Sequence, residues 1–377
     1  MKALVVLGTR PEAIKLAPVI LELRRQGAGQ VVVCTTGQHR EMVRPVLDLF
    51  GITPDFDLNL MRPNQSLNYL AGAVTSGVGQ VIDEVRPSAV VVQGDTTTAF
   101  AAALSAFHAK VPVAHVEAGL RTGDVASPWP EEMNRILIAR LADLHFPPTR
   151  LAYDNLRAEG VAADRILLSG NTVVDAALEV VRLTPAERTL ELDRRFGLFD
   201  RNLPMVLFTM HRRESFGAPM KRTFEALAAF CRTHAVQVIF PVHPNPQVRQ
   251  LAETILADVR GVQLVAPLEY DEMIHLLQRC RFVITDSGGL VEEAPTFRKP
   301  ALVLRETTER TESIEAGCAV LCGVGKPTAW KLGAELLADG ELFAKMSLDT
   351  RPYGDGRAAE RIAARLLSRR NRSARAA

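Results

Sequence analysis

The chain has 377 residues, which is long for a single domain, and its 47% hydrophobic and 23% charged residues are typical of a globular protein. A formal net charge of +2 excludes a general affinity for nucleic acid or for membrane surfaces. The five cysteines form no CxxC pair and the eight histidines show no metal-ligand spacing, so we expect neither a disulfide framework nor a metal centre.

Apolar runs alternate with amphipathic stretches through the first half of the chain. The run at 3–7 follows Met1 almost directly, with no cleavage site behind it, which indicates a first strand rather than a signal peptide. Further strands are expected at 31–35, 89–93, 111–116 and 166–168, and helices at 12–25 and 67–85. This alternation predicts βαβ units and a parallel sheet.

The second half repeats the pattern after a charged, weakly apolar stretch at 181–203. Strands are expected at 205–209, 236–240, 263–265, 282–285 and 301–304. We predict an α/β protein of two Rossmann-like, doubly wound domains facing a central cleft. The predicted boundaries are 1–170 for the first domain, completed by a C-terminal helix at 355–377, and 171–354 for the second.

Acidic residues gather where strands of the first half end. Glu117 follows the strand at 111–116, and the next helix begins with Glu131, Glu132 and Arg135. Ligands of open α/β sheets bind at the carboxyl ends of the strands, so carboxylates beside an arginine predict proton transfer near an anionic group. Taken alone, Asp95 after the strand at 89–93 is more typical of a helix N-cap, and Glu131 of a first helical turn.

Small and basic residues occupy the corresponding edge of the second half. The sequence TDSGGL at 285–290 follows a buried strand, and its amides can approach a phosphate. With Arg10, His211 and His243 at comparable strand ends, this predicts a diphosphate site. The segment after the first strand lacks GxGxxG and Gly325-Lys326 lacks the rest of a P-loop, which argues against a dinucleotide and a P-loop nucleotide.

These segments together resemble one family. The matching stretches are GTRPEAIKLAPV, TGQHREM, QGDTTT, HVEAGLRTGD with PWPEEMNR, HRRESFG, PVHPNP, TDSGGLVEEAP, and RETTER with EAG. The chain resembles the non-hydrolysing UDP-N-acetylglucosamine 2-epimerases, which share the fold of the two-Rossmann-domain (GT-B) glycosyltransferases. The matches run from residue 8 to residue 317 and so cover nearly the whole chain.

The resemblance implies reversible conversion of UDP-N-acetylglucosamine to UDP-N-acetylmannosamine with no cofactor and no metal. UDP is eliminated to leave 2-acetamidoglucal and is then added back, with a proton delivered to the opposite face of C2. The acid–base groups it implies are Asp95, Glu117 and Glu131, with His211 near the sugar and diphosphate. It does not decide which carboxylate takes the C2 proton.

The resemblance also implies the substrate contacts. Those to UDP fall on Arg10, Lys15, His211, Ser287, Gly288, Gly289, Glu293 and Arg310. The uracil is held by the segment from Leu268 to Met273, largely through main-chain groups, and Glu293 holds the ribose hydroxyls. Arg135 is expected to orient Glu131, one helical turn away, and His243 is a further candidate for the substrate site.

Some members of the family are activated by a second UDP-N-acetylglucosamine. Gln38 and His39 match that region, whereas Glu41 and Asn64 replace a Gln and an Arg of certain members. The other expectations are a UDP-sugar as the ligand, a homodimer, a cytoplasmic location, and no nucleic-acid or membrane partner. Two alternatives stay open: a hydrolysing 2-epimerase that releases N-acetylmannosamine and UDP, and a GT-B glycosyltransferase.

Overall fold

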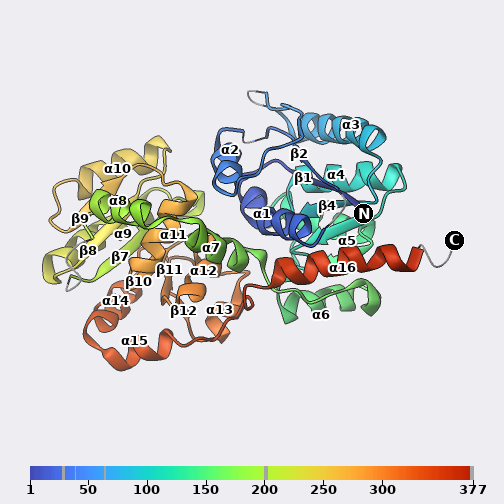
Figure 1. Ribbon diagram of the computed structural model, residues 1–377. Helices are drawn as coiled ribbons and strands as arrows, with labels where there is room; N and C mark the ends of the chain where they lie inside the picture. The colour runs from blue at the N-terminus through green and yellow to red at the C-terminus, as the bar shows by residue number, and fades with distance from the viewer. Residues whose placement is uncertain (28–29, 39, 63–64, 199–202, 374–377) are drawn as a thin grey trace. The chain divides into compact units, whose positions relative to one another are not determined.

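The computed structural model describes residues 1–27, 30–38, 40–62, 65–198 and 203–373. The chain forms two compact units, each with helices around its own sheet (Figure 1). The first consists of Met1–Glu179 with Tyr353–Ala377, and the second of Val180–Pro352. The first division falls within helix α7 (Thr172–Leu183), whereas the sequence placed it just before that helix.

The first unit contains a six-stranded sheet in which every pair is parallel. Its strands are β1 (Lys2–Leu7), β2 (Gln30–Thr35), β3 (Phe56–Asp57), β4 (Ala89–Gln93), β5 (Val113–Val116) and β6 (Leu144–Phe146). Its helices are α1 (Arg10–Arg25), α2 (Arg40–Leu49), α3 (Leu67–Val85), α4 (Thr97–His108), α5 (Glu131–Leu141), α6 (Arg150–Ala158), α16 (Ala358–Ser373) and most of α7. The strand order β3-β2-β1-β4-β5-β6 is that of a Rossmann domain.

The second unit repeats this order, counted from its own first strand, as β12-β11-β10-β7-β8-β9. Its strands are β7 (Met205–Thr209), β8 (Gln237–Pro241), β9 (Val262–Val265), β10 (Phe282–Thr285), β11 (Ala301–Val303) and β12 (Ala319–Leu321). Its helices are α8 (Ala186–Phe196), α9 (Ala218–Thr233), α10 (Pro246–Leu256), α11 (Tyr270–Arg279), α12 (Gly288–Glu293), α13 (Thr311–Glu315), α14 (Thr328–Ala338) and α15 (Gly340–Met346). The prediction of two doubly wound α/β domains is therefore confirmed for each unit.

The sequence failed at the short strands. The strand expected at 166–168 is wrong, because Ile166 makes only an isolated bridge to His145. The strands β3, β6 and β12 were missed, since they have two or three residues and β6 carries a histidine. Burial lowers the pKa of that histidine, His145, to about 4 and keeps it neutral.

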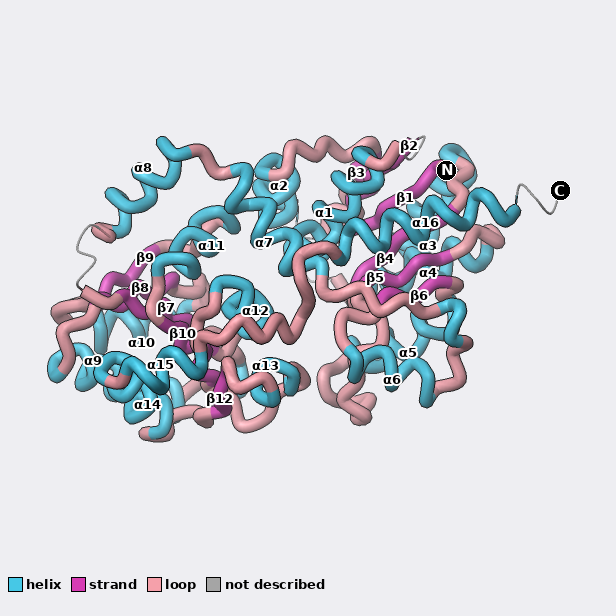
Figure 2. Tube along the Cα trace, turned by 60° about the horizontal axis from the view of Figure 1, so that its bottom comes forward, coloured by secondary structure: helices cyan, strands magenta, loops and turns pink. Residues whose placement is uncertain are grey.

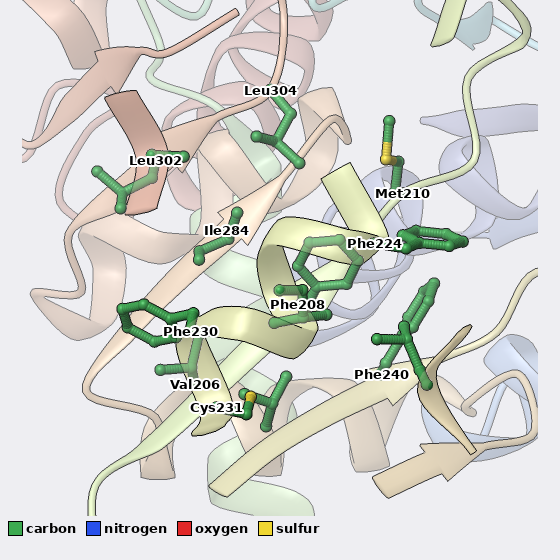
Figure 3. Packing of buried hydrophobic residues seen from close by; sticks show 14 of the residues in the cluster. Val206, Phe208, Met210, Phe224, Phe230, Cys231, Phe240, Ile284, Leu302 and Leu304 are labelled. Carbon is green, nitrogen blue, oxygen red and sulfur yellow. The ribbon is translucent and has the colours of Figure 1, made fainter. Parts of the chain in front are cut away.

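Aromatic side chains build the core of the second unit on one face of its sheet. Phe208 on β7 lies edge-on to Phe240 on β8, with ring centroids 4.8 Å apart, and Phe224 on α9 packs against both (Figure 3). All three rings are fully buried. In the first unit one face of β1 and β4 is covered by apolar residues of α3 and α4. Two rigid sheets result, and their strand ends present the polar side chains described below.

The C-terminal helix α16 belongs to the first unit although its sequence follows the whole second unit (Figures 1 and 2). It packs against α1 and buries Ile362, Ala363 and Leu366. Arg361 faces the other way and pairs with Asp355 at 2.7 Å. Among the described residues no helix combines the length and apolar character that crossing a bilayer requires.

The start of α16 is held by Asp175 on α7. Its two carboxylate oxygens accept the amide N–H groups of Ala358 at 3.3 Å and Ala359 at 2.8 Å. Burial raises the pKa of Asp175 to about 6, an effect larger than the opposing effect of these hydrogen bonds, and Asp355 adds to the increase. The folded chain therefore binds a proton at Asp175 more tightly than the unfolded chain, in which the carboxyl has its ordinary pKa of 3.8.

The raised pKa of Asp175 predicts how the free energy of unfolding depends on pH. For an acid whose pKa is raised on folding, the stabilisation is complete below the unfolded pKa and is lost as the pH rises through the folded pKa. We expect wild type to lose about 2 kcal/mol relative to Asp175→Asn between pH 4 and pH 7. Urea unfolding of both proteins across this range measures the difference, with exposed Asp83→Asn as control. If the free energy of unfolding of wild type instead rises relative to that of Asp175→Asn as the pH increases, the raised pKa is contradicted.

Candidate active site

Both sheets present polar side chains where their strand order reverses. In the first unit the reversal lies between β1 and β4, and in the second between β7 and β10. Ligands of doubly wound sheets bind at the carboxyl ends of the strands at this point, because the loops there diverge to opposite faces. The residues that the sequence singled out follow these strands or their neighbours in each unit.

Glu117 is buried at the end of β5 and has both oxygens engaged. Its Oε1 pairs with Nζ of Lys15 on α1 at 2.6 Å, and its Oε2 accepts a hydrogen bond from the Gln93 side chain. The backbone φ of Glu117 is +61°, a left-handed conformation that is costly for a residue with a side chain. Lys15, expected at UDP, thus forms an ion pair with an expected acid–base group.

Asp95 lies in the loop between β4 and α4 and pairs with Arg135. The Nη2 of Arg135 is 2.7 Å and its Nε 2.8 Å from Oδ2 of Asp95. The backbone carbonyl of Asp95 also accepts a hydrogen bond from the Asn134 side chain at 2.9 Å. Asp95 is not the N-cap of α4, because that role belongs to Thr96, whose hydroxyl accepts the Ala99 amide N–H.

Arg135 does not orient Glu131, as had been expected, because its other partner is Glu132 at 2.8 Å. Glu132 is only 1% exposed, and its second oxygen accepts the amides of Thr122 and Gly123. Burial acts to raise the pKa of Glu132, but Arg135 and these amides outweigh it and the pKa is lowered. Glu131 is half-buried at the first position of α5. A clamp of Asp95, Arg135 and Glu132 therefore holds the loop ahead of that helix.

The turn after β1 is organised by the fully buried Glu12. It accepts the amides of Gly8 and Thr9 at 2.8 and 2.7 Å, which forms a capping box on α1, and the Thr96 hydroxyl at 2.6 Å. Thr96 neighbours Asp95, so Glu12 joins the loops after β1 and β4. Burial raises the pKa of Glu12 in spite of these hydrogen bonds. Arg10 is half-buried at the first position of α1.

His115 on β5 supports the same edge from within the sheet. Its Nε2 is 2.7 Å from the carbonyl oxygen of Gly94, the residue before Asp95. Burial lowers the pKa of His115 to about 3, so the ring is neutral and its Nε2 carries the donated proton. Nearby, Gln38 accepts a hydrogen bond from the Thr98 hydroxyl at 2.7 Å. His39 and Asn64 lie outside the described residues.

In the second unit, His211 lies two residues beyond β7 and stacks on His243. The ring centroids are 5.5 Å apart and the planes differ by 11°. The Nδ1 of His211 is 3.3 Å from Oδ1 of Asp286, which follows β10 and is fully buried. The Nδ1 of His243 accepts the Asn245 amide at 3.1 Å. Burial, together with the charge of His211, lowers the pKa of His243.

The turn from β10 into α12 contains Ser287, Gly288 and Gly289. A Cβ on Gly288 would lie 2.6 Å from Cζ of Arg310, so a glycine is needed for the guanidinium to pack there. A Cβ on Gly289 would meet little, with only the Ser287 hydroxyl at 3.9 Å. Arg310 pairs with Glu292 at 2.9 Å and with Glu309. Arginine and small residues thus lie together at this strand end.

Glu293, expected at a ribose, is buried at the end of α12 and accepts the Tyr270 hydroxyl at 3.0 Å. Leu268 and Met273 flank the start of α11, and both side chains pack into the core cluster around β10. These two side chains therefore face the core of the second unit.

The sequence did not indicate functional roles for Gln93 and Asp286, and it indicated Glu132 without its pairing to Arg135. Gln93 contacts Glu117, Glu132 completes the clamp, and Asp286 faces His211. The spacing of Glu132 and Arg135, three residues apart in a helix, was a usable signal. The other two contacts depend on which strands are neighbours, and the local sequence does not contain that information.

Each unit supplies a different chemistry. The first presents two carboxylates in ion pairs, Glu117 and Asp95, and a third, Glu131, at a helix start. Such groups exchange protons with a bound molecule. The second presents arginine, histidine and glycine amides, which suit a phosphorylated ligand.

Known proteins are similar to this chain over nearly its whole length. A family model described as UDP-N-acetylglucosamine 2-epimerase matches residues 21–367. The UDP-N-acetylglucosamine 2-epimerase of Escherichia coli strain K12 is 45% identical over 373 residues, which cover 98% of this chain and 99% of that protein. The UDP-N-acetylglucosamine 2-epimerase of Bacillus subtilis strain 168 is 44% identical over 368 residues, which cover 97% of this chain and 95% of that protein.

Solved structures are similar over the same length. The UDP-GlcNAc 2-epimerase from Neisseria meningitidis, bound to UDP-GlcNAc, gives a TM-score of 0.92 at 41% identity and covers 98% of this chain and 100% of its own. The UDP-GlcNAc 2-epimerase from Methanocaldococcus jannaschii, in complex with UDP-GlcNAc and UDP, gives a TM-score of 0.79 at 30% identity. The match covers 98% of this chain and 99% of that chain.

Proposed function

The chain belongs to the UDP-N-acetylglucosamine 2-epimerase family, and we propose that it interconverts UDP-N-acetylglucosamine and UDP-N-acetylmannosamine without hydrolysis. Full-length similarity to the named epimerases supports the activity. The observation that carries the chemical proposal is the set of carboxylates at one strand edge of the first unit, two of them in ion pairs at 2.6 and 2.7 Å.

The proposed reaction has two steps that together invert C2. A carboxylate removes the C2 proton while the bond between C1 and the UDP oxygen breaks, and its electron pair leaves on UDP. The products are 2-acetamidoglucal and UDP. The UDP oxygen then adds back to C1, and an acid on the other side of the ring delivers a proton to the opposite face of C2. No atom is gained or lost, and a base and an acid suffice.

The first unit supplies these acid–base groups in our proposal. Asp95, Glu117 and Glu131 are the candidates, and the ion pairs with Arg135 and Lys15 hold the first two in place. Lys15 and Arg135 also place positive charge near the reacting ring, which stabilises negative charge that develops as the C2 proton is removed. The buried Glu132 and Glu12 serve as supports of the loops rather than as proton carriers, because backbone amides occupy their oxygens.

The second unit holds UDP. The amides of the turn from Ser287 to Gly289, together with Arg310 and His211, bind the diphosphate and stabilise the charge that it gains on leaving. Glu293 accepts hydrogen bonds from the ribose hydroxyls, and the main chain between Leu268 and Met273 meets the uracil. The core packing of Leu268 and Met273 supports this role for the main chain.

Turnover in deuterium oxide tests the proposal. We expect deuterium at C2 of both epimers as equilibrium is approached, because the proton removed by the carboxylate exchanges before its return. Proton NMR of the UDP-sugars measures the loss of the H2 signal, and the H3 signal of the same molecules serves as internal control. Retention of hydrogen at C2 in epimerised product contradicts the mechanism. Free N-acetylmannosamine accumulating in step with UDP identifies a hydrolysing enzyme instead.

A further inference from the structure

Asp286 is a fully buried carboxylate whose two oxygens face different groups. Its Oδ2 accepts the backbone amides of His211 and Arg212, each at 2.8 Å. Its Oδ1 lies 3.3 Å from Nδ1 of His211 and, among the described residues, has no hydrogen-bond partner. A buried charged oxygen without a donor is unfavourable, so the imidazole is the group that can satisfy it.

The position of Asp286 follows from the sheet. Thr209 ends β7 and Thr285 ends β10, and the two are paired in register with their hydroxyls 2.6 Å apart. Each strand therefore delivers its next residues to the same point, and the amide of Asp286 donates to the Thr209 carbonyl at 3.3 Å. The Arg212 side chain closes the turn by donating to the Asp286 carbonyl at 2.9 Å. The carboxylate is thus fixed, and the half-exposed His211 ring is oriented against it.

The neighbouring His243 has a different hydrogen-bond partner. Its Nδ1 is an acceptor for the Asn245 amide, and it stacks on His211 at 5.5 Å with nearly parallel planes. Burial with the charge of His211 lowers the pKa of His243. The main chain therefore occupies Nδ1 of His243, while Nδ1 of His211 is the ring nitrogen that faces the carboxylate.

We propose that Asp286 is a positioning residue: it keeps a proton on Nδ1 of His211 and orients the ring so that Nε2 faces the departing diphosphate. This rests on the proposed function, in which His211 meets UDP. The arrangement follows the logic by which a buried aspartate sets the tautomer and orientation of a catalytic histidine.

Other charged and titratable groups surround the pair. Asp286 faces His211 from the end of β10, and His243 from the end of β8. On its own turn His211 is followed by Arg212, whose guanidinium lies near further charged groups, namely Arg305, Arg310, Glu214 and Glu309. Burial and the two arginines lower the pKa of Arg212, while the two glutamates oppose them. Asp286 is the anion that directly contacts the His211 ring.

The first experiment measures the tautomer in the wild-type protein. With ¹⁵N-labelled histidine, and with His211→Asn to assign the signals, NMR of the ligand-free protein above its histidine pKa reports which ring nitrogen carries the proton. We expect His211 as the Nδ1–H tautomer, which is the less common form of a free imidazole. The Nε2–H tautomer overturns the proposal. This readout does not involve turnover, so it stands apart from any failure of the epimerase reaction.

The second experiment uses Asp286→Asn, whose oxygen can still accept the two backbone amides. In this variant the side-chain amide takes the place of Oδ1 and can donate to Nδ1 of His211, which favours the Nε2–H tautomer. The same NMR experiment is therefore expected to show the Nε2–H form, and kcat/KM is expected to fall by roughly 10²- to 10⁴-fold. Asp286→Asn in a His211→Asn background should not lower the rate further. An unchanged tautomer, or equal losses of kcat/KM in both backgrounds, shows that Asp286 acts only on the fold.

Discussion

Replacing Asp95 by asparagine is expected to lower kcat by roughly 10²- to 10⁴-fold and to change the affinity for UDP little. The substitution keeps the shape of the side chain, and an amide oxygen can still accept the hydrogen bond from Nε of Arg135. What it removes is the charge and the ability to carry a proton. The proposed contacts to UDP through the Ser287–Gly289 turn, Arg310 and His211 belong to the second unit, whereas Asp95 belongs to the first.

Stopped-assay kinetics and calorimetric titration of UDP measure the two quantities. Asp83→Asn is the matched control, because Asp83 is exposed on α3 and remote in sequence from the strand ends of the site. Glu131→Gln should show the same separation of kcat from UDP affinity. A parallel loss of turnover and UDP binding in Asp95→Asn, or a kcat within tenfold of wild type, argues against Asp95 as an acid–base group.

Gly119→Ala is expected to destabilise the first unit by roughly 3 kcal/mol. Gly119 has a φ of +89°, and a Cβ there would lie 2.2 Å from the carbonyl oxygen of Ala152 on α6. The positive φ accounts for roughly 1–2 kcal/mol and the overlap with fixed backbone for roughly 1–3 kcal/mol. The backbone at residue 119 must move to relieve this overlap. Because Gly119 follows Glu117 by two residues, that movement also displaces the Glu117 carboxylate, and activity should fall with stability.

Urea unfolding and steady-state kinetics on the same preparations check both effects. Gly72→Ala is the control, since Gly72 lies exposed inside α3 and a Cβ there meets nothing within 4 Å. That change is expected to stabilise the protein by up to about 1 kcal/mol, because alanine favours the helix. If the two substitutions change the free energy of unfolding equally, the backbone at Ala152 moves away from the added Cβ at little energetic cost, and the prediction is wrong.

The long strands were predictable because each is a continuous run of apolar residues. Val90, Val91 and Val92 of β4 are all buried, and such a run reports burial on both faces of a parallel sheet. The strands β3, β6 and β12 are too short to leave such a run, and they form because neighbouring strands offer an edge to pair with. Tertiary pairing decides them, so the local sequence carries no sign of them.

The partners of the site residues were harder to predict than their positions. Arg135 can reach Glu131 or Glu132 by helical spacing alone. The choice of Glu132 depends on which face of α5 is buried, and Glu132 is 1% exposed. Likewise Gln93 meets Glu117 because Gln93 is in register with Val116 on the adjacent strand. Contacts of this kind arise from strand register, which follows from the folded sheet.

The return of α16 to the first unit has a consequence for the order in which the protein matures on the ribosome. The second unit, Val180–Pro352, is one continuous stretch and can finish folding while translation is still under way. The first unit emerges earlier, yet it must wait with its α1 surface open until Ile362, Ala363 and Leu366 emerge after the whole second unit. The carboxylate-bearing half of the nascent polypeptide therefore starts to fold first and is completed after the other half.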